Sequence, residues 1–295
     1  MANVNYTVLK AAAWHQIGTN FEPLHSWSAP MSRELQADYQ ALIPLIIAKM
    51  EHNHAAEVLW HKILKQPIDQ AKPFIIGLTG SVAVGKSTIS KAIKQLLNKA
   101  VPEAKVEIVT TDNFLYNNET LASLQLTEHK GFPESYNIEA MITFLKAVKE
   151  RKPDIKVPVY SHEYYDILPH QSQVIGAPDV VILEGVNALY RQGQVLAPID
   201  LMDLTLYIDA PTALIKSWFM ERFEHLVDTA VNEPSSYYHR FINDRLVATS
   251  QAEKVWHAVN ERNLKEYILP ARSLADIIIQ KGPNHNVTQV ALRKY

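Results

Sequence analysis

The chain has 295 residues, of which 47% are hydrophobic and 20% are charged, and its formal net charge is −2. A chain of this size can bury a large core, and its near-neutral charge gives no electrostatic reason to expect a nucleic-acid partner. The absence of cysteine excludes disulfides, thiolate catalysis and cysteine-ligated zinc or iron–sulfur sites.

The sequence shows no sign of a secretory or membrane-spanning segment. Polar residues and a proline interrupt the first 30 residues, so no basic region followed by an apolar stretch is formed. The longest apolar runs, such as Ala41–Ala48 and Val180–Leu183, are far shorter than the ~20 residues that a membrane-spanning helix needs. We therefore expect a cytoplasmic protein with no membrane partner.

The first part of the chain is expected to be an extension of the main domain. Residues 1–30 lack periodicity and are predicted to be irregular. Apolar residues then recur at helical spacing from Ser32 to Lys65, which predicts two helices, and a proline-containing connector follows at 66–73. We expect residues 1–72 to form a helical extension packed on a core domain that spans residues 73–295.

From Phe74 onward, short apolar strands alternate with helices. The expected strands are Phe74–Thr79, Lys105–Thr110, Val180–Leu183, Leu204–Ile208 and Leu274–Ile279. The expected helices are Lys86–Leu97, Asn137–Lys149, one that begins near Pro211, and the stretches 236–248 and 252–267, and a short amphipathic segment ends the chain. This alternation predicts an α/β fold with a mainly parallel sheet flanked by helices.

A phosphate-binding loop lies between the first of these strands and its helix. The sequence fits the pattern GxxxxGK[ST] at every fixed position, with the residues Gly80, Ser81, Val82, Ala83, Val84, Gly85, Lys86 and Ser87, followed by Thr88. The glycines let consecutive N–H groups face a phosphate, and the positive end of the following helix points the same way. Lys86 would contact the β- and γ-phosphates, and the Ser87 hydroxyl would bind Mg²⁺. A P-loop NTPase fold that binds ATP or GTP is therefore predicted.

Two carboxylates follow strands whose ends should face this loop. Glu184 ends the strand at Val180–Leu183, at the sheet edge where ligands gather, and is a candidate for organising Mg²⁺. Asp112 follows the second strand and is a candidate for accepting the proton of a substrate hydroxyl during phosphoryl transfer. The alternatives are a solvated carboxylate for Glu184 and a turn or helix cap for Asp112.

Five further segments make the chain similar to a known family. They are TTDNFL at 110–115, KGFPESY at 130–136, VPVYSH at 157–162, ILEGVN at 182–187 and ILPAR at 268–272. With the P-loop, they resemble the bacterial type I pantothenate kinases. Uridine kinases and phosphoribulokinases share the P-loop and the acid after the second strand, but they are not expected to carry KGFPESY or PVYSH. The resemblance implies ATP-dependent phosphorylation of pantothenate to 4′-phosphopantothenate, the first step of coenzyme A biosynthesis.

The resemblance also implies roles for individual residues. Asp112 matches the catalytic base, Lys86 the lysine that holds the ATP phosphates, and Arg222 the arginine that steadies the transferred phosphoryl group. The residues that match the pantothenate pocket are Lys130, Tyr160, His162, Tyr165, Phe219 and Asn260. The residues that match a C-terminal stretch near the adenine are Lys281, Asn284 and His285. The resemblance further implies a homodimer and feedback inhibition by coenzyme A in competition with ATP.

The chain departs from the family pattern near the acceptor end of the site. Asn113 stands where the family usually has glycine, Phe219 where it commonly has tyrosine, and Leu226 where an aromatic residue is expected. Without the resemblance, His162 could be a surface histidine and Arg222 a solvated helix position, and the remaining candidates for a core-edge or surface role are Tyr160, Tyr165 and Asn260. Two other functions stay open: a kinase for another small alcohol, such as a nucleoside or sugar phosphate, and a non-catalytic sensor of nucleotide or coenzyme A.

Overall fold

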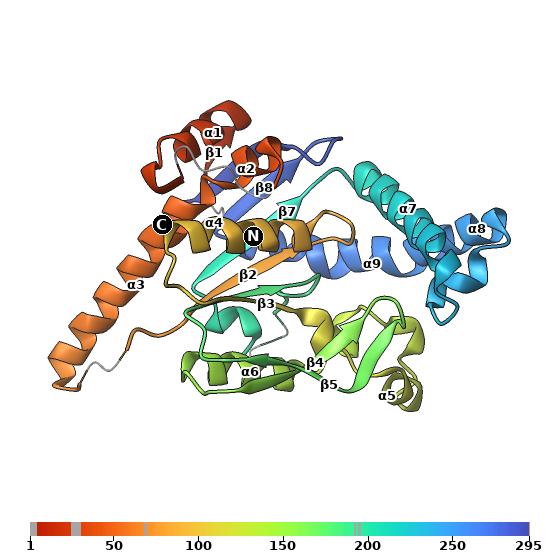
Figure 1. Ribbon diagram of the computed structural model, residues 1–295, viewed down its shortest axis with the longest axis horizontal. Helices are drawn as coiled ribbons and strands as arrows, with labels where there is room; N and C mark the ends of the chain where they lie inside the picture. The colour runs from red at the N-terminus through yellow and green to blue at the C-terminus, as the bar shows by residue number, and fades with distance from the viewer. Residues whose placement is uncertain (1–4, 25–30, 68–69, 192, 194–195, 295) are drawn as a thin grey trace.

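The computed structural model describes residues 5–24, 31–67, 70–191, 193 and 196–294. Within them, a seven-stranded sheet with the order β1-β9-β8-β7-β2-β6-β3 forms the centre of the molecule (Figure 1). The strands are β1 (Tyr6–Lys10), β2 (Phe74–Gly80), β3 (Val106–Thr110), β6 (Val180–Glu184), β7 (Leu204–Asp209), β8 (Ile277–Lys281) and β9 (Val287–Arg293). Neighbours from β8 to β3 are parallel, whereas β9 is antiparallel to β8 and β1. The predicted α/β fold with a mainly parallel sheet is confirmed.

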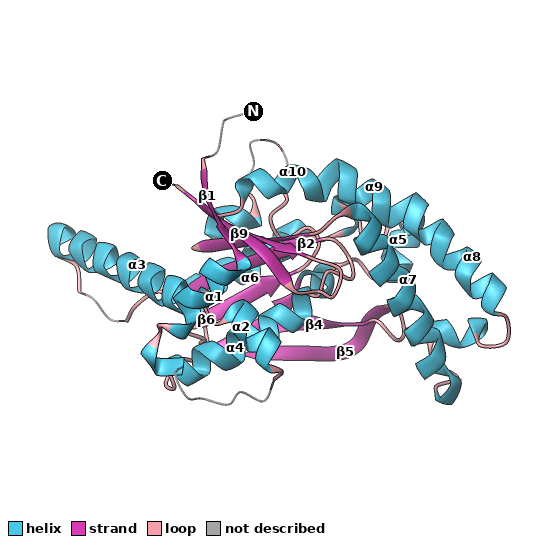
Figure 2. Ribbon diagram, turned by 90° about the horizontal axis from the view of Figure 1, so that it is seen from above, coloured by secondary structure: helices cyan, strands magenta, loops and turns pink. Residues whose placement is uncertain are grey.

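Helices flank the sheet and extend beyond it at both ends. They are α1 (Ala11–Thr19), α2 (Arg33–Tyr39), α3 (Leu42–Leu64), α4 (Lys86–Ala100), α5 (Asn118–Ser123), α6 (Ile138–Lys149), α7 (Thr212–Thr229), α8 (Arg245–Val255), α9 (Glu261–Asn263) and α10 (Leu269–Ala271). Two π-helical turns, Trp256–Asn260 and Leu264–Ile268, join α8 to α10 through α9. Figures 1 and 2 show α3 projecting from one end of the molecule and α7 and α8 lying at the other.

The central strands are buried on both faces, which explains why their sequences are mainly apolar. On β2, Ile76 belongs to a buried cluster that includes Ile93 of α4. The adjacent Ile75 belongs to a second cluster that includes Leu145 of α6. Because successive side chains of a strand point to opposite faces, one strand supplies both clusters. This two-sided burial fixes the strand register and therefore the sheet edge at which functional groups are displayed.

The N-terminal region is more regular than predicted. Tyr6–Lys10 pairs with β9 as an edge strand, and α1 follows it directly, so the prediction of an irregular segment is wrong for this part. The reason is that β1 is held by backbone pairing with a strand almost 300 residues away, and local periodicity carries no sign of such pairing. Residues 1–4 and 25–30 of that prediction lie outside the described residues.

The two helices predicted between Ser32 and Lys65 are present as α2 and α3. Trp14, Tyr39 and Leu42 are fully buried in the same cluster as α4. The division into an extension at 1–72 and a core at 73–295 stays a prediction, and β1 is the part of that extension that belongs to the main sheet.

Several boundaries in the second half of the chain differ from the prediction. The last parallel strand begins at Ile277, because Arg272–Leu274 forms a 3₁₀ turn, and the final amphipathic segment is the strand β9. The helix expected over 236–248 begins with the 3₁₀ turn Tyr237–Phe241, and α8 starts only after its cap at Asp244. Residues 150–179, for which no element is predicted, contain the hairpin of β4 (Ile155–Ser161) and β5 (Asp166–Ile175).

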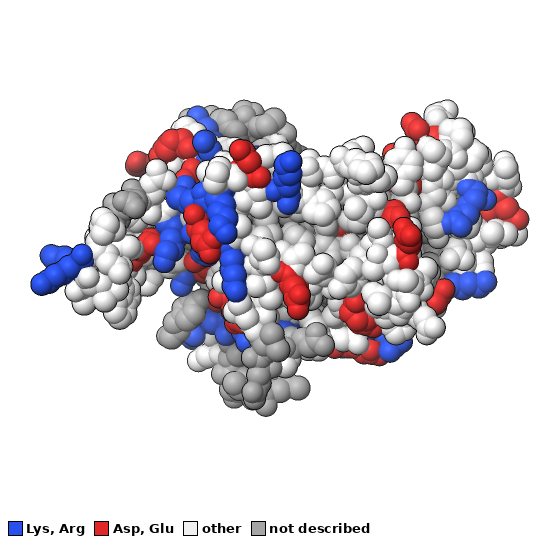
Figure 3. Space-filling view, turned by 90° about the horizontal axis from the view of Figure 1, so that it is seen from below, with Lys and Arg blue, Asp and Glu red and all other residues white. Residues whose placement is uncertain are grey.

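The surface in Figure 3 mixes both signs of charge. Acidic and basic side chains are interspersed on this face rather than gathered by sign. Electrostatic binding of nucleic acid calls for a basic patch or stripe, and this face displays none among its described residues. Over the described ranges of the chain, no helix is both long and apolar enough to cross a membrane.

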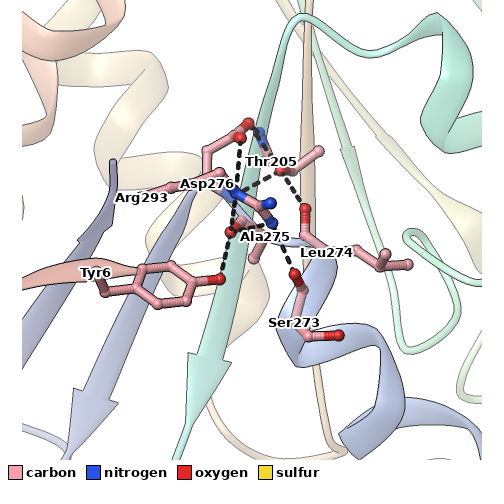
Figure 4. A network of polar contacts seen from close by, with 7 residues as sticks. All are labelled: Tyr6, Thr205, Ser273, Leu274, Ala275, Asp276 and Arg293. Atoms are coloured by element: carbon pink, nitrogen blue, oxygen red, sulfur yellow. Dashed lines mark hydrogen bonds and ion pairs between the residues drawn. The ribbon is translucent and has the colours of Figure 1, made fainter. Parts of the chain in front are cut away.

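A polar network joins the antiparallel edge of the sheet to the loop before β8 (Figure 4). The Tyr6 hydroxyl donates to the Ala275 carbonyl at 2.8 Å, and the Arg293 guanidinium donates to the same carbonyl at 2.9 Å. Arg293 also pairs with Asp276 at 3.5 Å. The Asp276 carboxylate in turn accepts bonds from the backbone N–H and the hydroxyl of Thr205, at 2.9 and 2.8 Å. The network thereby fixes β1, β7, β8 and β9 relative to one another.

Asp276→Ala tests how much this network stabilises the fold. Thr205 is only 5% exposed, so the substitution leaves its buried N–H without this acceptor, leaves its hydroxyl only the longer bond to the Leu274 carbonyl at 3.4 Å, and removes the anion beside Arg293. We expect the free energy of unfolding to fall by about 1–3 kcal/mol in urea titrations followed by circular dichroism. The exposed Glu128→Ala is the control and should change it by less than about 0.5 kcal/mol. Equal effects of the two variants would contradict the argument.

Candidate active site

The P-loop turns tightly between β2 and α4. Gly85 has φ +88°, a left-handed conformation that favours glycine, and α4 begins at the next residue. The Lys86 ammonium donates to the carbonyls of Gly80 at 3.0 Å and Ser81 at 2.8 Å. Burial lowers the pKa of Lys86 to about 8, against the opposing effect of the Glu184 and Asp112 carboxylates. Lys86 is thus held against the loop with which it is predicted to bind phosphate.

Glu184 lies beside the hydroxyl of the P-loop serine. Ser87 Oγ donates to Glu184 Oε1 at 2.6 Å, and Glu184 is 6% exposed, so it is not a solvated strand-end carboxylate. Within the described ranges, no group of three or more acidic or histidine side chains could hold a metal ion on its own. One carboxylate and one hydroxyl are hard oxygen donors that suit Mg²⁺, which commonly takes its remaining ligands from phosphates and water.

Asp112 lies in a 3₁₀ turn that follows β3. The Tyr136 hydroxyl donates to Asp112 Oδ1 at 3.2 Å, and His162 Nε2 is 3.8 Å from Oδ2. The cap of this turn is Thr110, whose hydroxyl accepts the Asp112 N–H at 3.3 Å. The Asp112 carboxylate therefore does not cap this turn, which was the alternative role that the sequence allowed. Tyr136, which stands out in the sequence only as part of the segment KGFPESY, is the residue that orients it.

Asn113 connects this turn to the β4–β5 hairpin. Its side chain is 5% exposed, and its Oδ1 accepts the backbone N–H of Tyr160 at 3.0 Å. A glycine at this position cannot make that bond. The departure from the family pattern at Asn113 therefore adds a contact that places Tyr160 relative to Asp112.

One cavity of about 180 Å³ gathers the predicted acceptor residues. Its lining includes Lys130, Tyr160, His162, Tyr165, Phe219 and Asn260. Asp112 and Arg222 line the same cavity, and so does Val82 of the P-loop. The cavity thus adjoins the phosphate loop.

The chain's relatives identify its family. The sequence model of the phosphoribulokinase/uridine kinase family matches residues 75–223. The pantothenate kinase of Levilactobacillus brevis is 41% identical, with 99% of each chain covered. The pantothenate kinase of Rhizobium meliloti is 42% identical over 88% of this chain and 81% of the relative. The chain belongs to the pantothenate kinase family.

The fold is also found in solved structures of other kinases. The D-glycerate 3-kinase from Cryptococcus neoformans superposes with a TM-score of 0.56 at 10% sequence identity, covering 87% of this chain and 98% of that one. At this identity, the similarity concerns the fold alone.

Lys130 of this pantothenate kinase family member is held by polar groups at the cavity wall. Its ammonium donates to Asn118 Oδ1 at 2.6 Å and to the Tyr165 carbonyl at 2.5 Å, and it lies 4.3 Å from the centroid of the Tyr165 ring. Burial lowers its pKa to about 8, while Asp166 and Asp112 act in the opposite direction. Lys130 therefore places an ammonium group with a lowered pKa in the wall of the cavity.

Asn260 and Asn263 give the cavity a polar side, and Asn187 shares a hydrogen-bond partner with Asn263. The Nδ2 groups of Asn187 and Asn263 both donate to the Gly131 carbonyl, at 3.0 and 2.7 Å. Their Oδ1 atoms, and Nδ2 of Asn260, are buried without a partner among the described residues. Because buried polar atoms are normally paired, these groups indicate a polar ligand or water. The sequence did not mark Asn263 as a site residue, because it lies in a helical stretch whose pattern indicates only packing.

Aromatic residues that the sequence did not single out close the cavity. Tyr237 and Tyr238 line it, and the Tyr237 ring stacks on Tyr165 with centroids 4.9 Å apart. The Tyr237 N–H also donates to the Glu163 carbonyl at 2.8 Å. The tip of the β4–β5 hairpin therefore meets the segment between α7 and α8.

The C-terminal residues expected near the adenine lie in and beside the β8–β9 turn. The His285 ring stacks on Trp218 with centroids 3.8 Å apart. Asn284 is exposed in this turn. Lys281 is buried, and its ammonium donates to the Val84 carbonyl of the P-loop at 2.9 Å. The stretch thus lies against the P-loop at Lys281.

Glu184→Gln tests the pairing of Ser87 with Glu184. The amide keeps an oxygen for the Ser87 hydroxyl but removes the negative charge. We expect the Mg²⁺ concentration for half-maximal binding of ATP, measured by calorimetry, to rise about tenfold or more, since carboxylate oxygens are the preferred ligands. Without Mg²⁺, ATP should bind as tightly as to the wild type or more tightly, because a repulsive charge is gone. The exposed Glu128→Gln should change neither value, and an unaltered Mg²⁺ dependence in Glu184→Gln would contradict the assignment.

Proposed function

We propose that this protein transfers the γ-phosphoryl group of ATP to the primary hydroxyl of pantothenate, giving 4′-phosphopantothenate. The observation that carries the proposal is the single cavity beside the P-loop that brings Asp112 and Arg222 together with every residue matched to the acceptor pocket. The relatives named pantothenate kinase support this acceptor over others.

The P-loop and its neighbours hold the nucleotide in this proposal. Lys86 and the loop N–H groups bind the β- and γ-phosphates. Ser87 and Glu184 would hold the magnesium ion, which would supply positive charge that neutralises part of the charge of the phosphates.

The reacting end of the site is formed by Asp112 and Arg222. Asp112 accepts the proton of the attacking hydroxyl, and Tyr136 keeps its carboxylate oriented. Arg222 spreads positive charge over the transferred phosphoryl group as negative charge develops there. Lys130, Tyr160, His162, Tyr165, Phe219 and Asn260 bind the acceptor.

A transfer assay with Asp112→Asn tests both acceptor and base. Wild-type protein should move labelled phosphate from ATP to pantothenate but not to uridine or a sugar phosphate. Asp112→Asn should bind ATP and pantothenate in calorimetry, while kcat falls about 10²–10⁴-fold, as expected when a general base is lost. The exposed Asp154→Asn is the matched control and should keep wild-type kcat.

The outcomes of this assay separate the alternatives. Turnover of uridine but not pantothenate would establish another kinase, and ATP binding without transfer to either would favour a sensor. A wild-type kcat for Asp112→Asn would exclude it as the base. Adding coenzyme A to the assay tests the predicted feedback inhibition. Leu226, which stands in place of an aromatic residue, is the departure from the family pattern that bears on this inhibition.

We also propose that the chain forms a homodimer through the outer part of α3. The large apolar side chains of Leu59, Trp60, Ile63 and Leu64 are 57–63% exposed there, at spacings that place them along one side of the helix. Contiguous exposed apolar surface of this kind marks an interaction site. Figure 1 shows this part of α3 projecting away from the sheet. A cytoplasmic location is the remaining part of the proposal.

Trp60→Glu tests this interface. Burying a new charge in an apolar interface is unfavourable, so the variant should sediment as a monomer at concentrations where the wild type is a dimer. Leu246→Glu, at an 85% exposed apolar position on α8, is the control and should leave the dimer intact. A monomeric wild type, or a dimeric Trp60→Glu, would contradict the proposed interface.

A further inference from the structure

Lys281 places a buried ammonium group against the main chain of the P-loop. It is the last residue of β8 and only 4% exposed. Its Nζ donates to the Val84 carbonyl at 2.9 Å. The same atom lies 3.0 Å from the position that a Cβ would take at Gly85. The side chain therefore contacts the loop at the peptide that leads into α4.

This contact determines the direction of a loop N–H. A trans peptide is planar, and its carbonyl and N–H point in opposite directions. Because the Val84 carbonyl points toward Lys281, the N–H of Gly85 points away from it. Backbone N–H groups at this place, just before a helix, are the donors that bind phosphate. Lys281 thus orients a phosphate-binding donor from behind the loop.

Lys281 and Lys86 contact different parts of the loop. Lys86 donates to the carbonyls of Gly80 and Ser81, at its beginning. Lys281 donates to Val84, near its end. The two ammonium groups together fix both ends of the turn.

The N-terminal helices supply the carboxylate that favours the charged form of Lys281. Burial lowers the pKa of Lys281 to about 8, and Asp38 of α2 is the acidic group that opposes this effect. Asp38 is itself buried, at 7% exposure, and accepts the Val287 N–H at 3.1 Å and a bond from His15 Nε2 at 2.9 Å. Val287 is the strand partner of Lys281, so Asp38 is anchored next to it.

We propose that Lys281 is a positioning residue of the P-loop, supported by Asp38, and that it acts on the phosphate end of the nucleotide rather than on the adenine. The proposal rests on ATP as the nucleotide of the proposed function, but it does not depend on the acceptor. It assigns the N-terminal region a part in nucleotide binding.

Binding of tripolyphosphate and of adenosine separates the two ends of the nucleotide. We expect Lys281→Met to weaken both ATP and tripolyphosphate about tenfold or more in calorimetry and to leave adenosine binding unchanged. Lys281→Arg keeps a charged donor and should recover part of this loss. The control is Lys99→Met, at an exposed position on α4, which should bind all three ligands as the wild type does.

Steady-state kinetics give a second measurement. Lys281→Met should raise the KM for ATP about tenfold while the KM for the acceptor changes less than about twofold. A lower thermal midpoint with unaltered affinities would show a purely structural residue and overturn the proposal. Weaker adenosine binding with unaltered tripolyphosphate binding would also overturn it, since it would indicate contact with the base.

Asp38→Asn keeps the proposal testable if Lys281→Met does not fold. Removing the carboxylate disfavours the charged form of Lys281, and we expect both ATP and tripolyphosphate to bind about threefold more weakly, with adenosine unchanged. Wild-type affinities in a folded Asp38→Asn protein would contradict the support that Asp38 is argued to give. Because these are binding measurements, failure of pantothenate to act as an acceptor would leave their outcome unaffected.

Discussion

The register of three neighbouring parallel strands is the constraint on which the site depends. Glu184 on β6 is level with Leu78 on β2 and with Thr110 on β3. The chain that leaves β2 forms the P-loop, and the chain that leaves β3 forms the turn with Asp112. A slip by one residue would move each buried side chain to the opposite face of the sheet, so the two apolar clusters hold the register. The core therefore fixes the distances between the phosphate loop, Glu184 and Asp112.

The acceptor side is constructed differently, from elements outside the sheet. The β4–β5 hairpin is attached to the turn that carries Asp112 through Asn113 and to the segment after α7 through Tyr237. The wall opposite includes Asn260, in a π-helical turn, a feature that is frequent at functional sites. Backbone hydrogen bonds and aromatic contacts between irregular segments thus define the cavity. Such segments differ more readily between relatives than a buried sheet does, in keeping with the departure from the family pattern at Asn113, whereas the departures at Phe219 and Leu226 lie on α7.

This difference explains how far the sequence could predict the molecule. The strands β2, β6 and β7 are mainly apolar, and the P-loop motif has fixed spacing, so both were predictable from local residues. Glu184 and Asp112 followed because a parallel sheet puts strand ends at one edge. The edge strand β1, the hairpin and the pairing of Tyr136 with Asp112 depend on contacts between distant segments and have no local signal. The positions in the acceptor cavity came from the family resemblance alone.

Nearby carboxylates favour the charged forms of the two lysines that contact the P-loop, even without a nucleotide. Lys86 and Lys281 are partly desolvated, and burial makes their charged forms less favourable than in water. Glu184 and Asp112 oppose this effect at Lys86, and Asp38 opposes it at Lys281. A bound triphosphate adds further negative charge next to the same ammonium groups, so it must raise their pKa. By linkage, the protein binds the triphosphate most tightly when both lysines are already charged. Asp38 thus prepares the loop for an anion by keeping Lys281 charged.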